Sequence, residues 1–207
     1  MMLEAPEAPE STEQSIKKAA RIVFLKKGLD QARTQEIADL AAVNHSLIPY
    51  YFKSKQKLFD IILAEVFNEF IAKVEKVVND GNTNFETKVY LLVDRYSEMV
   101  LESPYLPLYS ITVIRKGNSA VITYTKQMRI MLHHSVMARQ LKQEVEAGKF
   151  KPATLAQVIM NIVSLTLFPA LAAPVLQTMG DMKEEHYIQL IESRQKHIAE
   201  WVLHTLR

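Results

Sequence analysis

Residues 34–59 read TQEIADLAAVNHSLIPYYFKSKQKLF, and this stretch decides the fold. Its first part, Thr34 to Ala41, has helical spacing and carries Glu36 where a helix dipole favours an acid. Asn44 is a residue type that caps helices, and it precedes a second short segment that runs to about Phe52. One inward-facing set joins the two segments: Ile37, Ala38, Ala41, Val43, Ile48 and Phe52. This pattern is typical of a helix-turn-helix.

A helix-turn-helix inserts its second helix into the DNA major groove with the N-terminus leading. The side chains that this geometry presents to base edges are His45, Ser46, Leu47 and Tyr50. Hydroxyl groups and cations near the sugar-phosphate backbone position a protein without reading sequence. We expect that role for Thr34, Tyr51, Lys53 and Lys55, and we add Gln35 to the expected DNA contacts.

The charge around this stretch supports a local nucleic-acid interface. The chain of 207 residues has a formal net charge of only +2. Between Ser15 and Asp60, however, nine Lys and Arg stand against four Asp and Glu, a difference of +5. Because a charge run is usually a solvated face, Lys17, Lys18, Lys26 and Lys27 are by themselves expected to be surface lysines. The basic region is therefore assigned to the motif as a whole.

At these residues the sequence resembles the DNA-binding domain of the tetracycline-repressor (TetR/AcrR) family. The order that carries the resemblance is Thr34, Ile37-Ala38, Ala41, Val43-Asn44, Tyr51-Phe52, Lys55 and Leu58, within about residues 16–58. The resemblance implies a dimeric, ligand-responsive repressor that binds double-stranded operator DNA. It also implies phosphate contacts at Thr34, Tyr51 and Lys55, and base contacts at His45, Ser46, Leu47 and Tyr50.

Two positions depart from the family pattern. Ala42 stands in the turn where the family usually has Gly, and a left-handed backbone there costs an alanine about 1 kcal/mol. Pro49 stands inside the second helix, where the family usually has an aromatic residue. With Asn44 as the cap, Pro49 falls just beyond the first turn and deletes one backbone donor, which predicts a distorted or shortened helix.

The remaining sequence predicts an all-α chain of about nine helices. Residues 1–12 are expected to form a flexible arm, residues 13–57 the helix-turn-helix domain, and residues 58–207 a helical ligand-binding and dimerisation domain. Apolar periodicity predicts an N-terminal helix that stops at Gly28 and a long helix from Lys55 to about Asn79. Further helical stretches cover about 85–101, 105–116, 120–147, 152–176 and 184–206.

Residues 152–180 contain no charged side chain. This uncharged stretch is long enough for a membrane span on hydropathy alone. Gln157, Asn161 and Ser164 share one face, and Pro169 and Pro174 interrupt the helix. A buried bundle helix is therefore favoured over a membrane helix, and no membrane partner is expected. The alternative function that we weigh is a helical protein-binding or membrane-associated module with no DNA role.

Two sets of residues in the C-terminal part are candidates for binding. A small, largely apolar effector would suit aromatic and thioether side chains with few polar groups: Tyr96, Met99, Tyr105, Tyr109, Tyr124, Met128, Met131, His134, Asn161, Ser164 and Phe168. Packing within the core is the alternative for each of them. A homodimer interface is expected from Ile162, Leu165, Tyr187, Ile191, Arg194, Ile198 and Trp201, with packing inside one chain as its alternative.

Composition and motifs argue against several other classes of protein. With no Cys, the chain has no disulfide, thiolate zinc site or cysteine nucleophile. We find no phosphate-binding Gly-rich loop, no His-Glu-x-x-His and no nucleophile elbow, so we expect neither an enzyme nor a cofactor or metal site. The acidic first residues lack the pattern of a signal peptide, and we expect a cytoplasmic protein.

Overall fold

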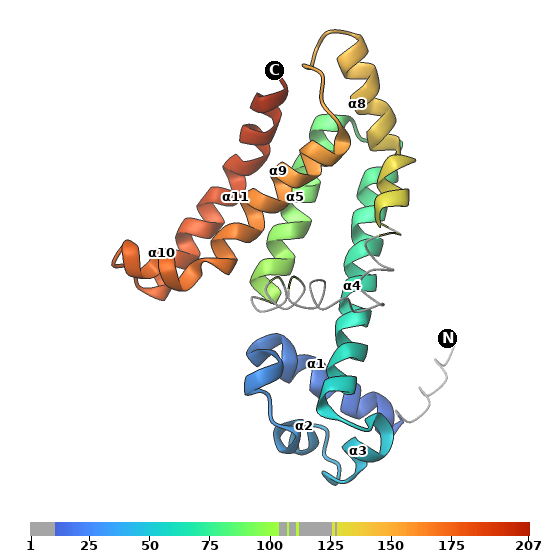
Figure 1. The fold of residues 1–207 in the computed structure, drawn as a ribbon, viewed down its shortest axis with the longest axis vertical. Helices are drawn as coiled ribbons and strands as arrows, with labels where there is room; N and C mark the ends of the chain where they lie inside the picture. The colour runs from blue at the N-terminus through green and yellow to red at the C-terminus, as the bar shows by residue number, and fades with distance from the viewer. Residues whose placement is uncertain (1–10, 104–106, 108–110, 112–125, 127) are drawn as a thin grey trace, which may run out of the picture. The chain divides into compact units, whose positions relative to one another are not determined.

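The computed structural model describes residues 11–103, 107, 111, 126 and 128–207, and Figure 1 shows their helices. Across these residues the chain is all-α, as predicted, with no strand. It divides into two compact units, Met1–Glu65 and Val66–Arg207. The elements with defined bounds are α1 (Thr12–Gln31), α2 (Thr34–Leu40), α3 (Leu47–Phe52), α4 (Lys55–Asn79), α5 (Phe85–Glu102), α8 (Val136–Glu146), α9 (Leu155–Leu171), α10 (Ala173–Met179) and α11 (Glu184–Leu206).

Helix α1 begins and is interrupted where its sequence predicts. The Ser11 side chain accepts a hydrogen bond from the Gln14 backbone, and the Gln14 side chain accepts one from the Ser11 backbone, which forms a capping box. At the other end Gly28 has φ 70° and breaks the regular helix. Residues without a side chain adopt this backbone at little cost, so the glycine ends the regular part of the helix.

The first unit has a small aromatic and aliphatic core. The rings of Phe24 and Phe59 meet edge to face with centroids 4.9 Å apart. Around them lie fully buried side chains from α1, α2, α3 and α4: Ile16, Ala20, Ile37, Ala38, Ile48 and Leu58. Small side chains such as Ala38 let short helices approach closely. The first turns of α4 therefore belong to this unit, which extends to Glu65.

The second unit is built around α5, which packs against α9 and α11 (Figure 1). Three of its helices start with a side-chain cap: Asn84 for α5, Ser135 for α8 and Thr154 for α9. The cap at Ser135 separates α8 from the helical residues before it, so the single stretch expected over residues 120–147 is wrong at that point. Hydroxyl caps compete with helix continuation, which apolar periodicity alone does not reveal.

The uncharged stretch forms two helices rather than one. Helix α9 ends at Leu171 and α10 begins at Ala173, with a bend of 68° between them. Pro174 lies in the first turn of α10, where the missing backbone donor costs nothing. Among the described residues no single helix is long and apolar enough to cross a membrane, and only this bent pair meets that test jointly.

One buried cation ties the α4–α5 connection together. Lys88 is fully buried, and its Nζ donates to the carbonyl oxygen of Thr83 at 2.5 Å and to Thr83 Oγ1 at 2.9 Å. Gln140 of α8 donates to the same carbonyl oxygen at 2.8 Å. Burial lowers the pKa of Lys88, and the charge of Asp80 opposes that shift.

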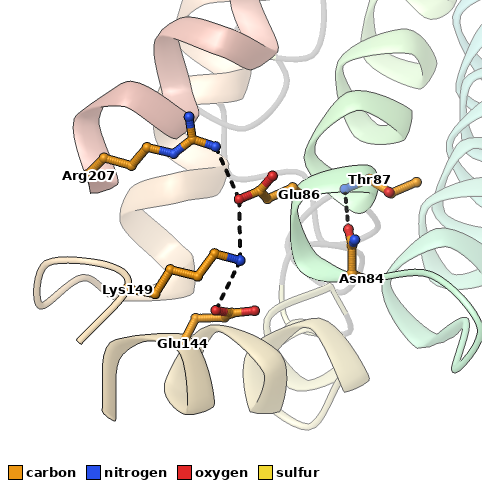
Figure 2. Close-up of polar contacts among 6 residues, drawn as sticks. All are labelled: Asn84, Glu86, Thr87, Glu144, Lys149 and Arg207. Carbon is orange, nitrogen blue, oxygen red and sulfur yellow. Dashed lines mark hydrogen bonds and ion pairs between the residues drawn. The ribbon is translucent and has the colours of Figure 1, made fainter. Parts of the chain in front are cut away.

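Ion pairs join three segments at the start of α5, as Figure 2 shows. Glu86 accepts from Arg207 at 3.1 Å, and Lys149 lies 3.5 Å from the same carboxylate and 3.2 Å from Glu144. Partial burial alone would raise the pKa of Glu86. The hydrogen bond from Arg207 and the charge of Lys149 outweigh burial, and the pKa of Glu86 is lowered.

We expect Glu86→Gln to destabilise the fold at neutral pH. A carboxylate with a lowered pKa in the folded state stabilises the fold above its unfolded pKa, and this contribution disappears as pH falls through the folded value. The deficit in urea midpoint should therefore be largest at neutral pH and shrink as the pH falls below the ordinary pKa of a glutamate. Glu146→Gln is the control, because the Lys142–Glu146 pair is wide at 3.7 Å and exposed. A deficit that is constant with pH would contradict the assignment.

Candidate nucleic-acid interface

The turn between α2 and α3 is a left-handed helix end. Ala42 has φ 54°, so the strained alanine that the sequence predicts is present. The backbone N–H of Ala42 donates to Asp39 O at 3.1 Å, and that of Val43 donates to Ala38 O at 3.0 Å. This pair of bonds is a Schellman motif, which satisfies carbonyl groups that the helix leaves open. It also turns the chain sharply into the segment that leads to α3.

Helix α3 begins later than the sequence predicts. Asn44 does not cap it: its Oδ1 accepts from the Ser46 backbone at 2.9 Å and from Ser46 Oγ at 2.7 Å. The helix starts at Leu47, so Pro49 is its third residue. Backbone N–H groups in a first turn have no partner within the helix. Pro49 therefore removes no hydrogen bond from the helix, and the expected loss of a donor is wrong. The preceding residue, Ile48, donates its backbone N–H to the His45 carbonyl oxygen at 3.2 Å.

The side chains predicted to read bases lie on the solvent side of this segment. Tyr50 is 76% exposed, and its ring meets that of Tyr51 edge to face at 5.1 Å. His45 and Ser46 are exposed and Leu47 is half-buried, whereas Ile48 and Phe52 are buried beneath them. An aromatic ring that is this exposed is free to contact a partner outside the chain.

Four of the predicted DNA contacts, besides Ser46, have hydrogen-bond partners within the first unit. Thr34 Oγ1 and His45 Nε2 share a hydrogen bond of 2.8 Å. Lys55 Nζ donates to the carbonyl oxygen of Ala32 at 3.0 Å, beyond the end of α1. Gln35 donates to Asp39 at 2.8 Å. Lys55 therefore has a structural contact that the sequence motif does not reveal.

The charges of the first unit divide into paired and open groups. Lys27 pairs with Glu36 at 2.6 Å, and Lys17 pairs with Glu65, which agrees with their expected place on the surface. Lys53 is exposed, and it follows α3 with φ 65°. No ion pair of Lys53 occurs within the described ranges.

Two further cations lie beside the predicted contacts and were missed. Arg33 is exposed immediately before α2, and Lys57 is exposed in the first turn of α4. Ser54 caps the start of α4: its Oγ accepts a hydrogen bond from the Lys57 backbone N–H at 3.1 Å. Both positions were visible in the sequence as basic residues at helix starts. A helix N-terminus attracts anions, so basic side chains there suit phosphate.

The candidate effector residues of the second unit do not all come together. Tyr96 is buried against Phe70, with ring centroids 4.9 Å apart, and burial raises the pKa of its phenol to about 12. Met99, Met128 and Met131 pack against the same core. Three further candidates point elsewhere: His134 and Ser164 are exposed, and Phe168 is 61% exposed.

Of the other effector candidates, only Asn161 lies among the described residues. Asn161 is half-buried, and its backbone carbonyl oxygen accepts a hydrogen bond from Ser164 Oγ at 3.2 Å. Tyr105, Tyr109 and Tyr124 lie outside the described residues. A groove of about 670 Å³ lies elsewhere, between α8 and the start of α9, and its lining includes Arg129, His133, Arg139, Leu141, Val145 and Leu155. The predicted effector residues that the structure describes do not line this groove.

The candidate dimer residues divide between core and surface. Ile162 and Ile198 are buried in the chain's own core, and the buried Tyr187 donates through its hydroxyl to Pro169 O. These three side chains therefore pack inside one chain, which is the alternative to a dimer interface. Leu165, Ile191 and Arg194 are half-buried. Trp201 is 42% exposed, with the Arg194 guanidinium 4.8 Å from its ring.

Comparison with known proteins identifies the first unit. Residues 16–62 match the model of the family described as bacterial regulatory proteins, tetR family. The HTH-type transcriptional repressor NicS of Pseudomonas putida is 36% identical over 88 residues. That match covers 41% of this chain and 42% of NicS, so the chain spans less than half the length of this curated relative.

Solved structures resemble the whole chain in fold. A TetR transcription regulator from Haloarcula marismortui has a TM-score of 0.60 at 19% identity, covering 95% of this chain and 98% of the other. The transcriptional regulator FadR from Bacillus subtilis, solved in complex with stearoyl-CoA, has a TM-score of 0.54 at 18% identity and covers 90% and 97%. Both parts of this chain therefore have the architecture of known regulators.

We expect Ala42→Gly to raise the free energy of unfolding of the first unit by about 1 kcal/mol, because glycine adopts a positive φ without steric cost. Urea unfolding measures the change. Ala41→Gly is the matched control: Ala41 has φ −79°, so glycine there gains nothing and adds backbone entropy to the unfolded chain. Equal effects at both positions would show that the turn is not strained.

Lys55→Met should lower the free energy of unfolding by about 1–2 kcal/mol, because it leaves the buried end of α1 without its charged donor. Lys53→Met removes the same charge from an exposed side chain and should change stability little. Thermal unfolding of both variants without DNA makes the comparison. If the two variants have the same midpoint, the Ala32 contact contributes nothing.

Proposed function

We propose that this chain, a member of the tetR family of bacterial regulatory proteins, is a transcriptional repressor that binds a palindromic operator as a homodimer and dissociates when a small, largely apolar effector binds. The observation that carries the proposal is the exposed face of α3, led by Tyr50 at 76% exposure. A face of this kind, after a helix-turn-helix turn, has the geometry for the DNA major groove.

Electrostatics support DNA as the partner of that face. Lys53, Lys57 and Arg33 are exposed and precede or follow the helices of the motif, where cations can contact the sugar-phosphate backbone. Lys55 has its ammonium on the Ala32 carbonyl, so its proposed phosphate contact requires it to share or exchange that bond. Tyr51 and Thr34 supply hydroxyl groups for phosphate oxygens, and Gln35 follows Thr34 on α2.

A second copy of the chain is proposed to cover an apolar surface on the second unit. Exposed apolar side chains gather on α9, α10 and α11: Met160, Phe168, Val175, Met179, Ile188, Leu190 and Trp201. Patches of this kind mark interaction sites in folded proteins. A two-fold dimer would hold two copies of α3 about 34 Å apart, or a multiple of one DNA turn, which calls for a palindromic site.

The effector is proposed to act on the second unit through α4. Tyr96 lies in one apolar core cluster and Met99, Met128 and Met131 pack against it, a chemistry that suits a largely apolar molecule. One unbroken helix, α4, carries the chain from the first unit into the second. Effector binding that favours one arrangement of α4 would lower operator affinity by population shift. This is a binding function without catalysis, in the cytoplasm where operator DNA is reached.

The proposal is tested by selecting DNA fragments with the purified full chain at two salt concentrations. We expect a palindromic site whose affinity falls steeply with salt. Lys53→Met should reduce the slope of log affinity against log salt by about one for each subunit while leaving base preference unchanged. Lys196→Met, which removes an exposed charge from α11, is the control and should leave the slope unchanged.

The outcome separates the two classes of function. A folded chain that enriches no DNA sequence would contradict the repressor and favour a helical protein-binding module. Enrichment of a site without two-fold symmetry would support DNA binding and contradict the proposed dimer.

A further inference from the structure

A hydrogen bond joins the first residue of α2 to the segment that leads into α3. Thr34 Oγ1 and His45 Nε2 lie 2.8 Å apart. His45 is otherwise exposed, and within the part of the chain that the structure describes its Nδ1 has no hydrogen-bond partner. One ring nitrogen is therefore held by the protein while the other is open to a ligand.

We propose that Thr34 is a positioning residue for base recognition: it fixes the tautomer of His45, so that Nδ1 accepts a hydrogen bond from the amino group of an adenine or a cytosine. The inference rests on the proposed function, because it requires DNA against the face of α3. It assigns the direction of the hydrogen bond at one operator position.

The direction follows from what each group can donate. A phosphate oxygen only accepts, so a Thr34 hydroxyl in contact with the DNA backbone gives its proton to phosphate. The hydroxyl oxygen is then left to accept from His45 Nε2–H. A neutral imidazole has one N–H, and Nδ1 must therefore be the acceptor. In the major groove adenine N6 and cytosine N4 are the amino donors, whereas guanine offers only acceptors.

The local backbone holds His45 in place for this role. Asn44 Oδ1 accepts from both the backbone N–H and the hydroxyl of Ser46, and the His45 carbonyl accepts from Ile48 N–H. These bonds flank His45 on both sides. The ring is thus fixed by the backbone at one end and by Thr34 at the other, and pre-organised groups discriminate best between ligands.

The test compares base preferences of full-length variants selected from random duplex DNA at pH 8, where imidazole groups are neutral. Thr34→Val removes the hydroxyl at equal size, and Thr34→Ser retains it. His45→Ala and the Thr34→Val/His45→Ala double variant complete the cycle. A lost phosphate contact weakens all sequences alike and cancels from a ratio of bases at one position.

For the wild type we expect adenine or cytosine to be favoured over guanine by at least about fivefold at one position of each half-site. Thr34→Val and His45→Ala should each reduce that preference to about twofold or less, and Thr34→Ser should restore it. In the double variant the ratio should equal that of His45→Ala. A guanine preference, or a ratio that Thr34→Val leaves unchanged, would overturn the assignment while leaving the repressor intact.

A second measurement does not depend on a substituted protein remaining folded. Nitrogen-15 spectra of the wild type bound to its selected operator should show His45 with a protonated Nε2 and an unprotonated Nδ1. The opposite tautomer would overturn the proposal. If the wild type selects no sequence at all, the proposed function fails together with this inference.

Discussion

The exposed face of α3 depends on one backbone constraint, the left-handed turn at Ala42. Its two hydrogen bonds close α2 and send the chain directly into the segment that carries His45 and α3. An alanine holds this conformation at an energetic cost, so the surrounding packing must stabilise it. Ile37 and Ala38 before the turn and Ile48 after it are all buried, and their burial supplies that stabilisation.

The first unit could largely be predicted from its sequence because local signals agree there. Ser11, Gly28 and Glu36 mark helix ends or first turns, and the inward apolar set has helical spacing. The start of α3 could not be predicted in the same way. Asn44 has the chemistry of a cap, but its side chain bonds Ser46 in a preceding turn, and only three-dimensional geometry distinguishes these two uses.

The second unit limits sequence reasoning for a different reason. Helical periodicity identifies an apolar face but not what covers it, so Ile198 in the core and Trp201 on the surface have the same signal on α11. Polarity is equally ambiguous: Gln157, read as part of a polar face, is bound in the cap of α9. Pocket and dimer residues depend on tertiary contacts that helical periodicity does not give, whereas the predicted DNA contacts rest on a compact local motif.

The buried Lys88 is a chemical probe for local opening of the second unit. Amine-reactive reagents modify lysines on the surface, but a side chain at 0% exposure with its Nζ bound to Thr83 is shielded for as long as the α4–α5 connection stays closed. Its labelling rate consequently reports opening of this region rather than surface chemistry. The described residues include many exposed lysines, whose labelling rates serve as the reference. The labelling rate of Lys88 relative to these lysines therefore measures local unfolding.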